Sequence, residues 1–182
     1  MGFSISWLAF EGATRSDVLA ATGMRDTGVV DEVNEAPFSC AEIPTGWTVL
    51  YSNNYLYAPS RHLKRLSRNR RILACISEEH VMFSAASLYV NGDEAWAVYH
   101  YPQSGLFDLS VSGNPPAQFV DIRDRQIEKQ RQAGGETSMV DHVFDIPIAL
   151  AADICGYRYD RCRFDWGKPA FTVAERSLTG RI

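Results

Sequence analysis

The chain lacks several features that would place it in a common functional class. It contains no run of the roughly 18 apolar residues that a membrane-spanning helix needs. Its opening residues, MGFSISWLAF, have neither the basic region nor the small-residue cleavage site of a secretory signal. No CxxC pair occurs among its cysteines, which are Cys40, Cys75, Cys155 and Cys162. We therefore expect a cytoplasmic protein with reduced thiols, no membrane association and no zinc site.

The motifs of widespread catalytic and nucleotide-binding sites are also missing. The sequence contains no GxGxxG, GxxxxGK[ST], HExxH, DxDxDG or GxSxG pattern. Common nucleotide, metalloprotease, EF-hand and serine-hydrolase chemistry is thus not supported, and we expect no cofactor and no metal. Catalysis by dispersed carboxylates and arginines stays open, because such sites have no fixed spacing along a chain.

The composition is that of a folded globular protein of modest net charge. Apolar residues make up 46% of the 182 residues and charged residues 22%, so disorder is not expected. A net charge of −4 does not favour general binding to nucleic acid or to an anionic membrane. The length predicts one domain over residues 1–160, with residues 161–182 as a C-terminal tail that packs on the domain or extends from it.

Periodicity and turn residues predict a fold rich in strands. We expect strands in FSISWLAFEG, GWTVLYSNNYLYA, ILACIS, HVMFSAASLYV, DEAWAVYHY and LFDLSVSG. Helices are expected in TRSDVLAATGM, PSRHLKRLSRNRR, PPAQFVDIRDRQIEKQRQAGG and DIPIALAADICGY. Residues 26–46 are acidic and rich in turn-forming residues. The order of elements predicts an α+β protein, with a mostly antiparallel, hairpin-rich sheet and three to four helices packed on one side of it.

The ends of two helices have recognisable local signals. Thr14 and Asp17 match a capping box, and Gly23 is a suitable residue to end the helix that they begin. Asp145 is expected to cap the last helix.

The dipeptide Asn91-Gly92 predicts a two-residue hairpin turn. That turn would place His100 opposite Phe83. Alternation of side chains along the strands would then direct His80 and His100 to opposite faces of the sheet, which disfavours a metal site shared by the two histidines.

The segment CISEEHVMFSAAS contains the candidate catalytic residues Glu79 and His80, which could act as acid and base. The alternative is that Glu78, Glu79 and His80 only form the polar join between two strands. His142 follows Asp141 and is a weaker catalytic candidate, because no nucleophile motif accompanies it.

Six of the 18 basic side chains lie within residues 61–71, a stretch without an acid. This cluster could meet a phosphate, an acidic protein surface or RNA, and arginine suits paired contacts with carboxylate and phosphate groups. The alternative is that acids within residues 26–42 neutralise it. RNA is not favoured, because no RNA-binding aromatic motif is present. The candidate binding residues are Arg61, Arg65, Arg68, Arg71, Glu32 and Glu35, with Asp31, Glu42, Tyr55 and Tyr57 as further contact candidates.

The segments MGFSISWLAF, EEHVMFSAAS and VDHVFDIP resemble a family of small uncharacterised bacterial α+β proteins. That family in turn is similar in type to immunity proteins, which neutralise bacterial toxins by binding them. We therefore expect a non-enzymatic protein-binding module whose partner is a toxin or another bacterial protein. The alternative is a small enzyme or ligand-binding domain in which Glu79 and His80 act beside the arginine cluster on an anionic substrate.

Overall fold

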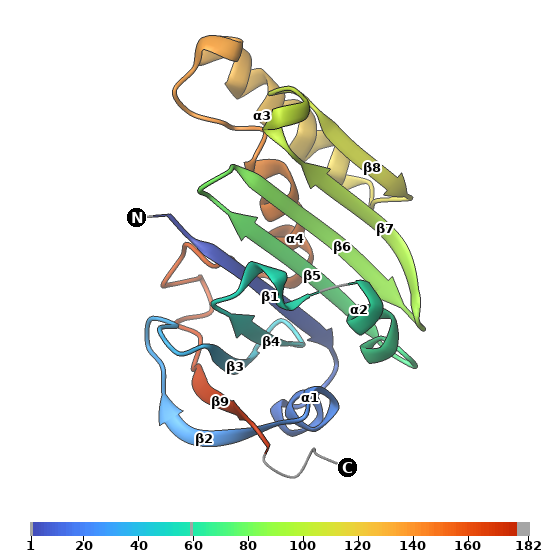
Figure 1. Ribbon diagram of the computed structural model, residues 1–182, viewed down its shortest axis with the longest axis vertical. Coiled ribbons are helices and arrows are strands. Elements are labelled where there is room, and N and C mark those ends of the chain that lie inside the picture. Colours follow the sequence, from blue (N-terminus) through green and yellow to red (C-terminus); the bar gives the residue numbers. More distant parts are fainter. Residues whose placement is uncertain (1, 59, 178–182) are drawn as a thin grey trace.

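The structure of the protein is a computed structural model, and it describes residues 2–58 and 60–177 (Figure 1). The strands are β1 (Ser4–Glu11), β2 (Met24–Val30), β3 (Phe38–Ile43), β4 (Trp47–Ser52), β5 (Arg71–Glu78), β6 (Phe83–Val90), β7 (Asp93–His100), β8 (Leu109–Gly113) and β9 (Thr172–Arg176). The α-helices are α1 (Arg15–Thr22), α2 (Ser60–Leu66), α3 (Gln118–Gln132) and α4 (Asp145–Cys155). Three short 3₁₀ helices are η1 (Tyr55–Tyr57), η2 (Pro102–Ser104) and η3 (Gly135–Thr137). None of the helices in the described part is long and apolar enough to cross a membrane.

All nine strands belong to one sheet in the order β2-β9-β3-β4-β1-β5-β6-β7-β8. Every neighbouring pair is antiparallel. The predicted α+β class and the antiparallel sheet are confirmed. The central strands are buried on both faces, as shown by β1, in which Ile5 to Phe10 are all buried.

The helices cover both faces of the sheet, whereas the sequence predicted all of them on one side. On β1 the side chains of Trp7 and Ala9 join a core with α3 and α4, while Leu8 and Phe10 join a second core with α1 and α2. In Figure 1, α1 and α2 lie in front of the sheet and α4 lies behind it. A continuous apolar run is typical of a strand buried on both faces, but it does not show which helix covers which face.

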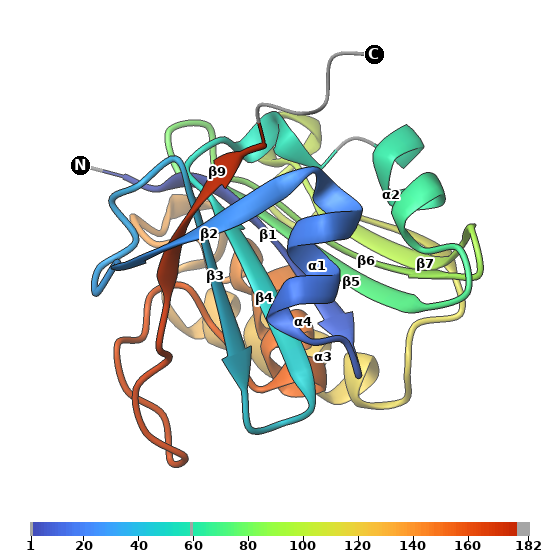
Figure 2. The same ribbon diagram turned by 90° about the horizontal axis from the view of Figure 1, so that it is seen from below.

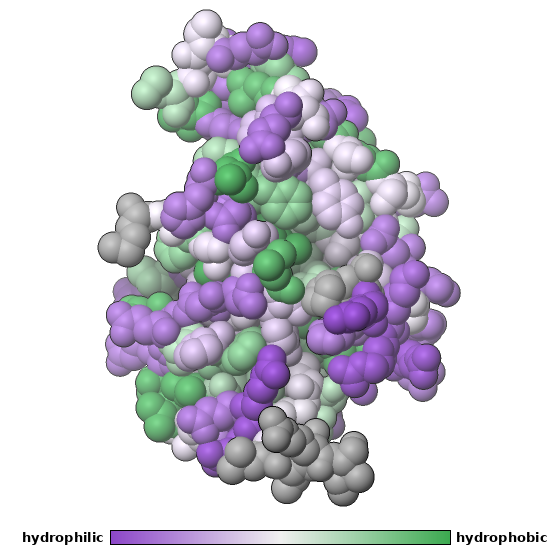
Figure 3. Space-filling model, viewed as in Figure 1, coloured by the Kyte–Doolittle hydropathy of each residue, from purple (hydrophilic) through white to green (hydrophobic). Residues whose placement is uncertain are grey.

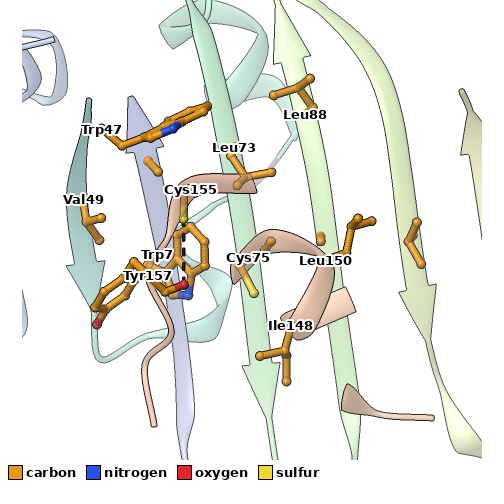
Figure 4. Close-up of a cluster of buried hydrophobic side chains, with 14 of the residues drawn as sticks. Trp7, Trp47, Val49, Leu73, Cys75, Leu88, Ile148, Leu150, Cys155 and Tyr157 are labelled. Atoms are coloured by element: carbon orange, nitrogen blue, oxygen red, sulfur yellow. Dashed lines mark hydrogen bonds between the residues drawn. The ribbon is translucent and has the colours of Figure 1, made fainter. Parts of the chain in front are cut away.

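The larger core lies between the sheet and helices α3 and α4 (Figure 4). The rings of Trp7 and Tyr157 meet edge to face, with centroids 5.5 Å apart. The thiol of Cys155 lies 3.8 Å from the carbonyl oxygen of Tyr157. Burial raises the pKa of the Cys155 thiol to about 12, so this cysteine is a neutral core residue.

The predicted helix α1 forms with the capping that its sequence indicates. The Thr14 hydroxyl accepts a hydrogen bond from the Asp17 amide, and the Asp17 carboxylate accepts one from the Thr14 amide. Gly23 ends the helix in the left-handed conformation. The predicted helix α4 also forms, but the prediction that Asp145 caps it was wrong. Asp145 does not cap the helix; its carboxylate instead accepts hydrogen bonds from Arg158 and Gln126.

The β6–β7 hairpin has the predicted two-residue turn but a different register at its far end. Asn91 and Gly92 both have positive φ angles, as the turn requires. The register then shifts by one residue between Leu88 and Tyr89, so His100 lies opposite Ser84 and not Phe83. The imidazole of His100 therefore faces α4, on the side to which Ser84 also points.

Two strands lie where the sequence indicated none. Residues 24–30 and 38–43, within or beside the stretch read as acidic turns, form β2 and β3. Part of the predicted C-terminal tail forms β9, which pairs with β2 on one side and with β3 on the other. The tail therefore completes the sheet.

Candidate functional site

Glu78 is an anchored carboxylate at the end of β5. Its side chain is only 9% exposed. One oxygen lies 2.7 Å from Nδ1 of His80 and accepts a hydrogen bond from the His80 amide, and the other accepts one from the Ser4 hydroxyl. Burial opposes ionisation of Glu78, but the hydrogen bonds from Ser4 and His80 outweigh it and lower the pKa of the carboxyl.

Glu79 connects two distant parts of the chain. Its Oε2 accepts a hydrogen bond from the Phe3 amide at 2.9 Å, and its Oε1 accepts one from the Tyr159 hydroxyl at 2.8 Å. The Tyr159 oxygen accepts a further bond from the Ser77 hydroxyl. Both oxygens of Glu79 thus link separate parts of the fold. This agrees with the alternative that Glu79 only belongs to the polar join between two strands.

His80 and His142 take no part in a convergent catalytic arrangement. The side chain of His80 is 62% exposed and lies beside Glu78. His142 is half-buried, and its backbone amide donates to the side chain of Gln130. The described residues contain no group of three or more His, Cys, Asp or Glu side chains that could hold a metal ion.

A second histidine that pairs with a carboxylate is His100, which the sequence did not indicate as a site residue. It is completely buried, and its Nε2 lies 2.8 Å from Oδ2 of Asp141. Its Nδ1 lies 2.8 Å from the carbonyl oxygen of Asp108. No substrate can reach a ring with no exposed surface, so this pair serves the fold.

The arginine cluster lies at the opposite end of β5 from Glu79 and His80. Arg71 begins the strand and Glu78 ends it, a span of eight residues. At about 3.3 Å per residue the strand separates the two groups by more than 20 Å. The structure thus does not join the residues on which the enzyme alternative depends.

Helix α2 and the turn after it present four cationic side chains to solvent. We call this set the basic surface, and it consists of Arg61, Lys64, Arg65 and Arg68. Leu63 and Leu66 anchor the helix in the smaller core. Figure 3 shows strongly hydrophilic side chains gathered over this helix. Arg71 is not part of the surface, because it forms an ion pair with Glu11 at 2.9 Å.

The acids of residues 26–42 do not neutralise the basic surface. Asp26 pairs with Arg15 at 3.3 Å, Glu32 pairs with Lys168 at 3.0 Å, and Glu42 accepts a hydrogen bond from the Arg15 amide. Glu35 is exposed. The loop that carries Glu32 and Glu35 lies on the other side of the molecule from α2 (Figures 1 and 2). Among residues 2–58 and 60–177, no ion pair involves a side chain of the basic surface.

A cavity of about 580 Å³ lies between α1 and β2, but its charged groups satisfy one another. The guanidinium of Arg15 donates to Asp26, to the Thr172 hydroxyl and to the Ala170 carbonyl oxygen. The cavity therefore offers no free charged group to a ligand.

No protein-family model matches the chain, and neither a curated protein nor a solved structure matches it. The basic surface is the strongest candidate functional site, and it rests on the geometry of the molecule alone.

Proposed function

We propose that the protein is a non-enzymatic binding module that docks an acidic protein surface onto its basic surface. One observation carries the proposal: four exposed cationic side chains on a single helix and turn have no acidic partner within the described part of the molecule. Like charges held close together repel one another, and a partner that supplies carboxylates removes this repulsion.

The chemistry of the side chains indicates the class of partner. Three of the four are arginines. The planar guanidinium of arginine forms paired hydrogen bonds with carboxylates, and arginine is frequent among the residues that contribute most to binding at protein interfaces. The net charge of −4 of the whole chain disfavours indiscriminate binding to polyanions. An acidic protein toxin, neutralised in a bacterial cytoplasm in the manner of an immunity protein, is a partner of this class.

Affinity capture with a charge-reversed variant tests the proposal. The variant Arg61→Glu/Lys64→Glu/Arg68→Glu reverses the basic surface but retains Arg65. The matched control Arg125→Glu/Lys129→Glu/Arg131→Glu reverses three exposed charges on α3. We expect the natural chain and the control to retain a specific acidic protein from nuclease-treated extracts of the source organism, and the surface variant to lose it.

The captured protein is then purified and its affinity is measured at low and high salt. We expect weaker binding at high salt, because the contacts are between exposed charges. The proposal is wrong if equal capture by the two variants is observed, or if capture disappears on nuclease treatment, which would assign the surface to nucleic acid. For a toxin, co-expression with the natural chain should restore growth, and co-expression with the surface variant should not.

A further inference from the structure

A second cavity, of about 300 Å³, lies between α2, the start of β2 and the end of β9. Its lining combines basic and apolar side chains: Thr22, Gly23, Met24, Tyr57, His62, Arg65, Leu66, Arg176 and Ser177. No carboxylate belongs to this lining. The cavity is large enough for a small organic ligand.

Arg65 and Arg176 are more than 100 residues apart in the sequence, and both line this cavity. Neither guanidinium forms an ion pair or a hydrogen bond with the described residues. Six other arginines of the described residues do contact a carboxylate: Arg15, Arg25, Arg71, Arg123, Arg131 and Arg158. Two unpaired guanidinium groups at one cavity leave an uncompensated positive charge.

Two neighbouring rings respond to this positive charge. Burial and then the cations Arg65, Arg61 and Arg176 lower the pKa of His62 below its usual value. Burial raises the pKa of Tyr57, and Arg176 and Arg65 oppose that rise. Both rings line the cavity together with the two arginines, so the directions of these pKa shifts agree with the placement of the four side chains.

We infer that this cavity binds a small phosphate monoester, with Arg65 and Arg176 holding the phosphate oxygens and with Met24, Leu66 and Tyr57 contacting the organic part. Arginine forms paired, charge-assisted hydrogen bonds with phosphate. A phosphate monoester carries a charge of about −1.5 to −2 at pH 7, which matches two guanidinium groups better than a single carboxylate does. The apolar side chains of the lining favour a ligand with an organic substituent over inorganic phosphate.

The inference goes beyond the proposed function, because it assigns a small-molecule site to a cavity that shares only Arg65 with the basic surface. Arg65 lies in both, whereas Arg176 and His62 belong only to the cavity and Arg61 and Arg68 only to the basic surface. Variants at Arg176 and Arg68 therefore separate the two sites.

Titration calorimetry with phenyl phosphate tests the site in the full-length chain. We expect saturable binding of phenyl phosphate, weaker binding of inorganic phosphate and no binding of phenol at the same concentration. Arg176→Gln should weaken the binding of phenyl phosphate at least about tenfold, the effect of losing one charged hydrogen bond of about 1.5 kcal/mol. The control Arg68→Gln removes an equal charge outside the lining and should change the affinity less than about twofold.

A second measurement follows His62 by NMR while pH is varied. Saturating phenyl sulfate, whose charge is constant over this range, should raise the pKa of His62 because it neutralises the adjacent arginines. The assignment is overturned if phenyl phosphate does not bind, if phenol binds equally well, if Arg68→Gln weakens binding as much as Arg176→Gln, or if His62 does not respond. A phosphoserine peptide that binds more tightly than phenyl phosphate would reassign the cavity to a protein ligand.

The two proposals can fail separately. Phenyl phosphate binding that is lost in Arg176→Gln supports the cavity even when no protein partner is captured. Capture that depends on Arg61, Lys64 and Arg68 supports the docking surface even when no phosphate compound binds.

Discussion

His100 and Asp141 are 41 residues apart in the sequence and form a buried charged pair. Both nitrogens of the imidazole face acceptors, the Asp141 carboxylate at 2.8 Å and the Asp108 carbonyl oxygen at 2.8 Å. A carbonyl and an ionised carboxylate can only accept hydrogen bonds, so the ring donates from both nitrogens and carries a positive charge. The pair joins the end of β7 to the segment before α4.

The charge on His100 makes the stability of the protein depend on pH. Burial disfavours the charged ring, but the bonds to Asp141 and to the Asp108 carbonyl outweigh burial and raise its pKa. A raised pKa contributes stability that is fully present below the unfolded value of about 6.5 and is lost as pH rises through the folded value. We expect the loss of unfolding free energy caused by His100→Gln to be larger at pH 5.5 than at pH 9, measured by urea unfolding.

Asp141 makes the stability of the protein depend on pH in the opposite direction, at acidic pH. Its pKa is lowered, because the hydrogen bonds from His100 and the Phe144 amide outweigh its burial. Its contribution is present above about pH 3.9 and is lost as pH falls through the folded value. His142→Gln serves as the control for His100→Gln. If the two variants lose unfolding free energy with the same dependence on pH, His100 is not the group responsible for it.

Gly113 lies close to the backbone of the neighbouring strand β7, beside the residues at which the β6–β7 register shifts. It lies opposite Trp96 with a φ of +67°, and a Cβ atom there would lie 2.1 Å from the carbonyl oxygen of Ala95. We expect Gly113→Ala to lower the unfolding free energy by about 3 kcal/mol or more, because backbone atoms must move. Gly12→Ala has a similar φ of +64° but open space, so it should cost only about 1–2 kcal/mol. Equal losses in the two variants would contradict the steric explanation.

Glu79 is expected to be a stability residue rather than a catalytic one. Glu79→Ala leaves the Phe3 amide and the Tyr159 hydroxyl without their acceptor, at a cost of about 1–3 kcal/mol in unfolding free energy. Faster hydrogen exchange of the Phe3 amide would accompany this loss. Glu35→Ala, at an exposed site, is the control and should change stability by less than about 0.5 kcal/mol. An unchanged unfolding midpoint for Glu79→Ala would refute the role.

Asp31 organises the loop between β2 and β3. Its carboxylate accepts hydrogen bonds from the amides of Glu35 and Ala36 and from the Ser39 hydroxyl. Asp31→Ala should therefore lower the unfolding free energy by about 2–4 kcal/mol, since three donors lose their acceptor in a buried setting. Glu32→Ala removes only an exposed ion pair and should cost less than about 1 kcal/mol. Thermal unfolding of the two variants compares these values directly, and equal midpoints would show that the loop does not depend on Asp31.

The parts of the fold that were predicted correctly depend on short-range chemistry. Thr14, Asp17 and Gly23 define α1 within ten residues, and Asn91-Gly92 defines a turn by its backbone conformation alone. The shift in register at Ala95 was missed, because Asn91-Gly92 predicts a regular two-residue hairpin and no local pattern marks an extra residue in β7.

The candidate site was predicted only in part. The sequence identified Arg65 by its position in a basic stretch, but Arg176 lies more than 100 residues away and gave no signal. Asp141 was noticed beside His142, yet its partner is His100, which the β6–β7 register brings into place. Pairings across such distances arise from the topology of the sheet.

The position of β9 has a consequence for how the chain is made. Among the described strands, β2 pairs only with β9, which is synthesised after the other eight. A nascent chain can therefore pair the strands β3, β4, β1, β5, β6, β7 and β8, while β2 has no strand to pair with. The sheet closes only after synthesis has reached residue 176, when a strand from the C-terminal end enters between two segments made more than 100 residues earlier. Until β9 has been made, the incomplete chain exposes the unpaired edge of β3. Such non-local pairing also folds slowly.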